Sequence, residues 1–161
     1  MNLNFIKLSK AQADLDKHIS EEKNIKHADF IKEKAIALCV EFGELLNERP
    51  FIFKYWANKE GDRAEALLEY IDGLHFLLSY GNSIAFDFSK YQYKRPQEMD
   101  QRDIILGLFA IVGNLPYIKQ FEEALTYYLM FGENLNFTTE EVEAAYFAKN
   151  EVNHERQEVG Y

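Results

Sequence analysis

The stretches EFGELLNE, residues 41–48, and EYID, residues 69–72, decide how this chain folds. Each carries two carboxylates three positions apart, namely Glu41 with Glu44 and Glu69 with Asp72. Residues three apart on an α-helix are surface neighbours, so each pair can direct its oxygens at one point. Two such pairs on facing helices would form a negative, oxygen-lined pocket of the kind that Mg²⁺ selects.

The sequence around both pairs has the period of a helix. In the helix expected from residue 28 or 29 to residues 47–49, the glutamates lie on the shoulder of an apolar stripe. The helix expected over residues 62–80 is apolar nearly all round after Gly73, which predicts that other elements cover it on both sides. Clustered carboxylates on a covered helix repel each other and need a cation or protons. The competing interpretation is that such acidic pairs simply lie on exposed helix faces.

The rest of the chain continues the helical pattern, and no strand-like alternation is convincing. We expect helices over residues 4–19, 99–114 and 116–131, a charged connector over 20–27 and a loop over 82–95. Gly81 and Gly132 are placed to end helices, and Pro116 suits a first helical turn. Thr138 and Glu141 form a capping box before the last helix. The prediction is an all-α bundle of about five to six main helices in a single domain, residues 1–161.

Composition limits the functions that the chain can have. The apolar share of 47% and the charged share of 28% are typical of a globular protein. The net charge of −9 argues against nucleic-acid binding. The single cysteine, Cys39, is expected to be a small core residue and leaves no disulfide to form within the chain, which suits a reducing compartment. With no signal-peptide pattern and no membrane-length apolar run, we expect a cytoplasmic protein that does not bind membranes.

Three further groups of residues each allow two interpretations. Gln12 and Asp16, four residues apart on the first helix, are either a specific polar pair or part of an ordinary polar helix face. The aromatic and basic segment 50–61 either plugs onto the core or forms a wall for a planar base, with lysines near anionic groups. The polar stripe of the last helix is either a solvated helix end or a set of hydrogen-bond donors for phosphates. Its residues are Lys149, Asn150, Asn153, Arg156 and Gln157.

The motifs EFGELLNE, FKYWANK, EYIDGLHFLLSYG and YFAKNEVNHERQEVGY, in this order, closely resemble the dimeric dUTPase family, a branch of the all-α NTP pyrophosphohydrolases related to MazG. The resemblance covers nearly the whole chain. It implies a helical bundle whose active site lies between helices and is completed in a homodimer. It also implies Mg²⁺-dependent cleavage of dUTP, with dUDP as a further substrate, to dUMP. Pyrophosphate is released from dUTP, and Mn²⁺ is a possible substitute for Mg²⁺. Such an activity would cleanse the nucleotide pool and supply dUMP.

The resemblance also implies roles for individual residues. The metal ligands are Glu41, Glu44, Glu69 and Asp72. The nucleotide site is lined by Lys54, Trp56, Asn58 and Lys59. The tail residues that hold the phosphates are Lys149, Asn153 and Arg156, with Asn150 and Tyr146 beside them. The residues at the uracil are Gln12 and Asp16.

These roles make chemical sense. Relatives are also expected to carry an amide at the position of Asp16, but a carboxylate can accept the N–H at N3 of uracil while Gln12 donates to a carbonyl oxygen. Either Glu41 or Glu44 would orient or deprotonate the attacking water. The sequence leaves two alternatives open. One is a pyrophosphatase of the same fold that prefers dCTP or a modified nucleotide, and the other is a non-catalytic helical protein whose acidic surface binds a partner.

Overall fold

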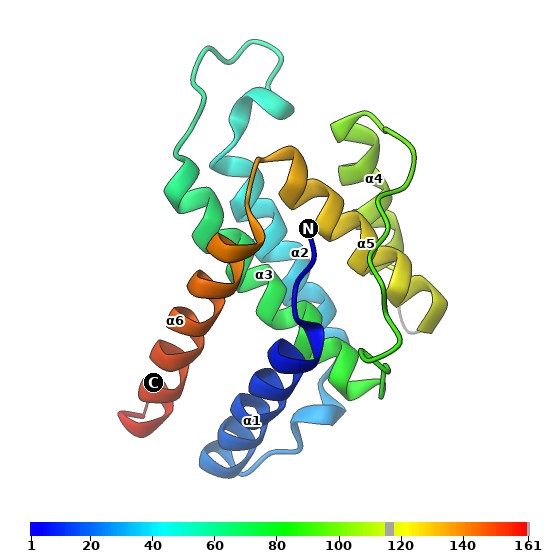
Figure 1. Cartoon of the computed structure of the whole chain (residues 1–161). Coiled ribbons are helices and arrows are strands. Elements are labelled where there is room, and N and C mark those ends of the chain that lie inside the picture. Colours follow the sequence, from blue (N-terminus) through cyan, green and yellow to red (C-terminus); the bar gives the residue numbers. More distant parts are fainter. Residues whose placement is uncertain (115–117, 161) are drawn as a thin grey trace.

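The computed structural model describes residues 1–114 and 118–160, and within these ranges every regular element is helical (Figure 1). The helices are α1 (Phe5–Lys23), α2 (Ile31–Asn47), α3 (Arg63–Ser83), α4 (Gln101–Val112), α5 (Ile118–Asn134) and α6 (Thr139–Glu158). Short 3₁₀ turns lie at His27–Asp29 and Pro50–Ile52. The prediction of an all-α bundle is therefore confirmed. Across the described ranges, none of the helices combines the length and apolar character that crossing a membrane would require.

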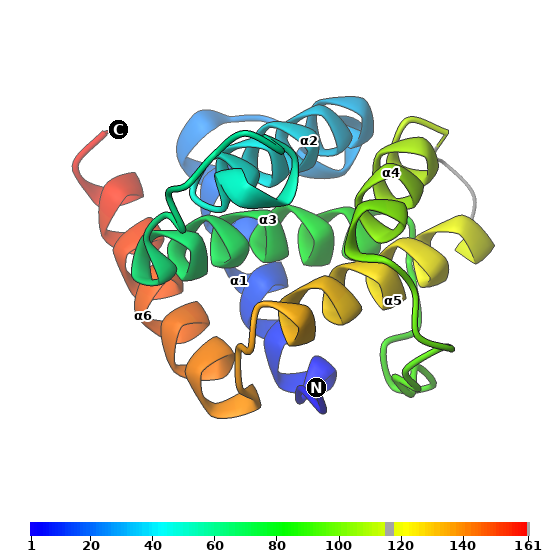
Figure 2. The ribbon, with the colours of Figure 1, turned by 90° about the horizontal axis from the view of Figure 1, so that it is seen from above.

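Helix α3 is the central element of the bundle. It packs against α2 on one side and against α1 and α6 on the other, as the view from above shows (Figure 2). From Gly73 to Gly81 every residue except Phe76 is buried. The prediction that this helix is covered on both sides is correct. Its polar side chains therefore face other helices and have to find partners there.

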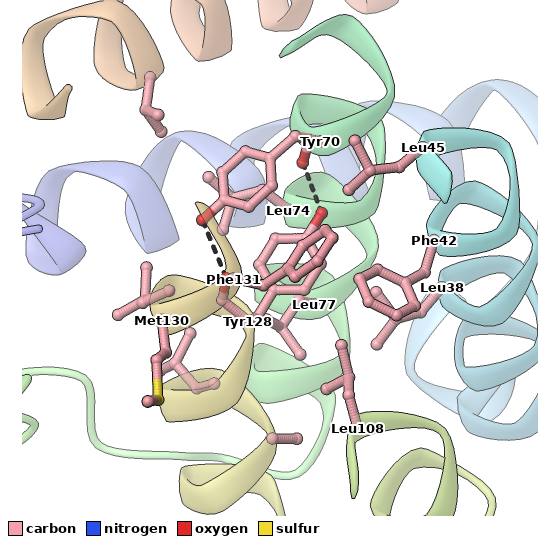
Figure 3. Close-up of a cluster of buried hydrophobic side chains, with 14 of the residues drawn as sticks. Leu38, Phe42, Leu45, Tyr70, Leu74, Leu77, Leu108, Tyr128, Met130 and Phe131 are labelled. Atoms are coloured by element: carbon pink, nitrogen blue, oxygen red, sulfur yellow. Dashed lines mark hydrogen bonds between the residues drawn. The ribbon is translucent and has the colours of Figure 1, made fainter. Parts of the chain in front are cut away.

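The core joins α3 to α5 through two interlocked tyrosines (Figure 3). The rings of Tyr70 and Tyr128 stack with their centroids 4.6 Å apart. The hydroxyl of Tyr128 donates to the carbonyl oxygen of Tyr70 at 2.6 Å, and the hydroxyl of Tyr70 donates to the carbonyl oxygen of Tyr128 at 3.4 Å. Phe42 of α2 packs its ring edge-on against Phe131 of α5. Because both buried phenols have partners, these aromatic residues stabilise the centre without an unsatisfied polar group.

Two glycines have a different role from the one predicted. Helix α3 continues through Gly81 to Ser83, and α5 continues through Gly132 to Asn134. A Cβ atom at Gly81 would lie 2.5 Å from a ring atom of Phe88, and one at Gly132 would lie 2.6 Å from the Tyr70 hydroxyl. The prediction that they end helices is wrong. They let aromatic rings approach the helix backbone.

Several predicted helix boundaries also differ from the structure. Helix α1 extends beyond residue 19 to Lys23, where Asn24 adopts a left-handed conformation and its N–H caps the helix. The charged connector is correspondingly shorter, and residues 27–29 form a turn before α2. Helix α4 is shorter than predicted at both ends and begins at Gln101, directly after the N-cap Asp100. The capping box of Thr138 and Glu141 is confirmed, and Pro116 lies outside the described residues.

Candidate functional site

A cavity of about 390 Å³ lies between α1, α3 and α6 and reaches α2 at one end. These helices bring together residues that are far apart in the sequence. The predicted site residues that line the cavity are Gln12, Asp16, Glu41, Asp72, Lys149, Asn153 and Arg156. The cavity therefore has an acidic end, where α2 meets α3, and an amide end next to α1.

At the acidic end, one oxygen from each of three carboxylates converges. The ligand atoms of Glu41, Glu69 and Asp72 all lie within 4.8 Å of one another. We call these three residues the acidic trio. The spacing of three residues places Glu69 and Asp72 on one face of α3, and α2 supplies Glu41 opposite them. Glu44 is exposed and lies outside the trio, but its negative charge raises the pKa of both Glu41 and Glu69.

The negative charge of the acidic trio is only partly balanced by Lys149, whose ammonium lies 2.6 Å from Oδ2 of Asp72. Burial, followed by the charges of Asp72, Glu44 and Glu69, raises the pKa of Glu41 to about 7. Burial also raises the pKa of Glu69, with Glu44 and Asp72 as the next causes. A bound cation would relieve this repulsion. Since the converging atoms are all carboxylate oxygens, the donor set fits a hard divalent ion such as Mg²⁺.

At the amide end, Gln12 and Asp16 form a buried hydrogen-bonded pair. The amide nitrogen of Gln12 donates to Oδ1 of Asp16 at 2.8 Å, and the Ser79 hydroxyl donates to Oδ2 at 2.8 Å. Oε1 of Gln12 accepts from the Tyr146 hydroxyl at 2.9 Å and lies 2.8 Å from Nδ1 of His75. The interpretation as an ordinary solvated polar face is therefore wrong for Gln12 and Asp16.

This network fixes the tautomer and the protonation state of His75. Because the Gln12 amide nitrogen faces a carboxylate, its oxygen faces the imidazole, so Nδ1 of His75 carries a hydrogen. Burial, followed by the charge of Lys149, lowers the pKa of His75 to about 3. The ring is therefore neutral at physiological pH, and it stacks on Tyr146 with the centroids 4.2 Å apart.

Sequence reasoning missed four residues around Gln12 and Asp16. His75 and Ser79 are polar residues in the apolar part of α3, and such residues in a covered helix need partners, which was the available signal. Lys34 is only 4% exposed, and its ammonium donates to the Ser83 hydroxyl at 2.6 Å. His27 places Nδ1 3.6 Å from Oδ1 of Asp16. Nothing in the local sequence pattern indicated that either residue approaches Asp16.

The aromatic and basic segment 50–61 does not line the cavity. In Figure 1 the connection between α2 and α3 extends beyond the ends of both helices. Tyr55 and Trp56 are 93% and 67% exposed, so the interpretation that these aromatic rings plug onto the core is wrong. The buried residues of this segment are Pro50 and Ile52. Lys54, Trp56, Asn58 and Lys59 thus stand apart from the other predicted site residues.

The polar stripe at the end of α6 faces the cavity. The helix continues to Glu158, and Lys149, Asn153, Arg156 and Gln157 line the cavity wall. The ammonium of Lys149 lies 2.6 Å from Oδ2 of Asp72, and the Arg156 guanidinium donates to Oδ1 of Asn153 at 3.5 Å. Asn150 is buried on the same helix but does not line the cavity.

Comparison with known proteins adds one match. A family model described as dUTPase matches residues 4–161. A comparison with curated proteins finds no match. The family match includes both ends of the cavity, the exposed segment between α2 and α3, and the whole of α6.

Proposed function

The chain belongs to the dUTPase family, and we propose that it hydrolyses dUTP to dUMP and pyrophosphate with the help of Mg²⁺, with dUDP as a further substrate. The observation that carries this proposal is the convergence of the acidic trio at one end of a cavity whose other end holds buried amide and carboxylate groups. A nucleoside triphosphate has the matching polarity, with anionic phosphates at one end and a hydrogen-bonding base at the other.

The acidic end would hold the metal through Glu41, Glu69 and Asp72, with Glu44 at the rim. A Mg²⁺ ion held by these residues would neutralise charge on the phosphates and make a water more acidic. Glu41 lines the cavity and Glu44 does not. We therefore favour Glu41 as the group that takes the proton of the attacking water, and Glu44 as a supporting ligand.

The amide end would bind the uracil. Oδ1 and Oδ2 of Asp16 each have a further lone pair, and the Gln12 amide has a second hydrogen, so the pair can still accept an N–H and donate to a carbonyl oxygen. Ser79 and Tyr146 hold the two groups in place. Between the two ends, Lys149, Asn153 and Arg156 of α6 would stabilise the charge that develops on the leaving phosphates.

We also propose that the protein acts as a homodimer in the cytoplasm, each chain forming one domain. The segment 50–61 supports the dimer, because it exposes aromatic rings and basic groups at a distance from its own cavity. In a dimer, Lys54, Trp56, Asn58 and Lys59 of one protomer would complete the nucleotide site of its partner. Sedimentation analysis, combined with mixing of a Trp56→Ala chain and an Asp72→Asn chain, tests this arrangement: a shared site restores activity in the mixed dimer.

The direct test of the function is a panel of dUTP, dUDP, dTTP and dCTP, assayed for pyrophosphate or phosphate release with Mg²⁺ and with EDTA. We expect Mg²⁺-dependent turnover that is far more efficient for dUTP than for dTTP, since the methyl group at C5 must find room. A clear preference for dCTP would instead indicate the related pyrophosphatase with another base preference. Absence of turnover and of Mg²⁺ binding would indicate a helical interaction protein.

A further inference from the structure

Lys149 occupies a position that its expected role as a phosphate ligand does not explain. Its ammonium lies 2.6 Å from Oδ2 of Asp72, and both side chains are only 22% exposed. Its charge also lowers the pKa of Glu41 and of Glu69, opposing the larger effect of burial and of the neighbouring carboxylates. One ammonium group therefore acts on all three members of the acidic trio.

This single charge does not balance the trio. The ion pair of Lys149 is with Asp72, whereas ligand oxygens of Glu41, Glu69 and Asp72 all lie within 4.8 Å of one another, so three carboxylates face one ammonium group. A divalent cation at the converging oxygens would supply the missing charge, but it would then share the Asp72 carboxylate with Lys149. Two cations at one carboxylate repel each other, so metal binding and the Lys149–Asp72 ion pair oppose each other.

We propose that Lys149 is the counter-ion of the acidic trio when no metal is bound, and that Mg²⁺ releases it to bind the phosphates of the nucleotide. This inference rests on the proposed function. It gives the site an order of binding. The metal binds first, and this frees the Lys149 ammonium to donate to a phosphate. It also explains why a lysine, whose flexible stem lets one charge serve two positions, stands here.

The geometry of α6 determines where the released ammonium can go. Asn153 lies one helical turn after Lys149 and Arg156 lies two turns after it, so the three share a helix face. All three line the cavity. Lys149 thus exchanges an internal carboxylate for a ligand phosphate by rotating about its own side-chain bonds, with no movement of the helix. The metal and the nucleotide would then strengthen each other's binding.

The proposal predicts that one substitution has two opposite effects. Lys149→Met removes the competitor of Mg²⁺, so the affinity of the nucleotide-free protein for Mg²⁺ should rise by about tenfold, a typical size for coupling between two sites. The same change removes a phosphate donor, so the affinity for a non-hydrolysable dUTP analogue in the presence of Mg²⁺ should fall. A residue that only binds phosphate would leave Mg²⁺ affinity unchanged.

The experiment is isothermal titration calorimetry with MgCl₂ alone, and then with the dUTP analogue, on wild type and three variants. Lys149→Met is compared with Lys149→Arg, which keeps the charge, and with Lys10→Met, which removes one positive charge from an exposed position of α1. We expect higher Mg²⁺ affinity in Lys149→Met only. A Mg²⁺ affinity in Lys149→Met equal to or below that of Lys10→Met overturns the proposal.

A second measurement needs no substitution. The NMR signal of the Lys149 ammonium in the wild-type protein should shift on addition of MgCl₂ without nucleotide, while that of Lys10 should not. An unchanged Lys149 signal at saturating Mg²⁺ also overturns the proposal. If wild type hydrolyses dUTP with Mg²⁺ and these results are negative, only the role of Lys149 fails. If wild type neither binds Mg²⁺ nor hydrolyses any nucleotide, the proposed function fails.

Discussion

The two ends of the cavity differ in how far the protein itself supplies partners for their polar groups. At the acidic end, Glu41, Glu69 and Asp72 repel one another, and Lys149 balances only part of their charge. At the amide end, the polar atoms of Gln12 and Asp16 have partners within the protein. This difference indicates that a ligand completes the acidic end. The acidic end is strained without a cation, whereas the amide end is already organised to bind.

The largest expected effect comes from removing one carboxylate of the acidic end. Asp72→Asn should lower Mg²⁺-dependent dUTP hydrolysis by at least about a hundredfold, because charge stabilisation by the metal is worth several kcal/mol. The exposed Glu65, one turn before Glu69 on α3, provides the matched control as Glu65→Gln. Turnover assays decide the matter. If Asp72→Asn stays within a few fold of wild type, the acidic end does not hold the metal.

A change at the amide end should act differently. Gln12→Leu removes one hydrogen bond each from the Asp16 carboxylate and the Tyr146 hydroxyl and leaves Nδ1 of His75 without its acceptor. The free energy of unfolding should therefore fall by about 1–3 kcal/mol. Efficiency on dUTP should fall by about tenfold or more, with Mg²⁺ affinity unchanged. Denaturant unfolding and calorimetry measure both quantities, with Gln97→Leu in the exposed loop as the control. A loss of Mg²⁺ affinity in Gln12→Leu would show that the two ends are not independent.

The third expected effect is a pH dependence of the free energy of unfolding, which has opposite signs at the two ends of the metal-free protein. Glu41 has a pKa of about 7 when folded and 4.5 as its ordinary value, so the folded state holds its proton longer and this residue makes stability fall as pH rises from 4.5 to 7. His75 has a pKa of about 3 against an ordinary 6.5. As the pH drops, the unfolded state binds a proton at His75 before the folded state does. This residue therefore lowers the free energy of unfolding as pH drops from 6.5 towards 3.

Free energies of unfolding measured across this pH range in EDTA separate the two contributions. Glu41→Gln should weaken the first trend, leaving the part that comes from the raised pKa of Glu69, and should leave the second trend unchanged. His75→Phe, which keeps a ring against Tyr146, should weaken the second trend and leave the first. Added Mg²⁺ should abolish the Glu41 trend in wild type, because it holds the carboxylate ionised. A Glu41→Gln profile that parallels wild type would remove the evidence for strain at the acidic end.

The features that depend on local spacing could be predicted from the sequence. The helices follow from the period of about 3.6. The three-residue spacing predicted that Glu41, Glu44, Glu69 and Asp72 share one point, and the structure brings together all of these except Glu44. The capping box of Thr138 and Glu141 is likewise a local hydrogen-bond pattern. The residues of the capping box lie within one helical turn. The carboxylates lie on single faces of two helices that pack against each other.

The features that depend on tertiary contacts could not be predicted in the same way. A glycine that ends a helix and one that admits an aromatic ring look alike in sequence, and Gly81 and Gly132 are of the second kind. Lys34 and Asp16 line one common cavity because α2 and α1 both pack against α3. The exposed position of segment 50–61 depends on how the connection leaves the bundle, for which no periodic pattern exists.

The measurement that tests the central claim most directly compares two ligands by calorimetry, each with Mg²⁺ and with EDTA. The ligands are deoxyuridine, which reaches only the amide end, and a non-hydrolysable dUTP analogue, which reaches both ends. The account predicts that Mg²⁺ strengthens binding of the triphosphate analogue by at least about tenfold and leaves binding of deoxyuridine unchanged. Equal Mg²⁺ dependence for both ligands, or none for the analogue, would contradict the division of the cavity into a metal end and a base end.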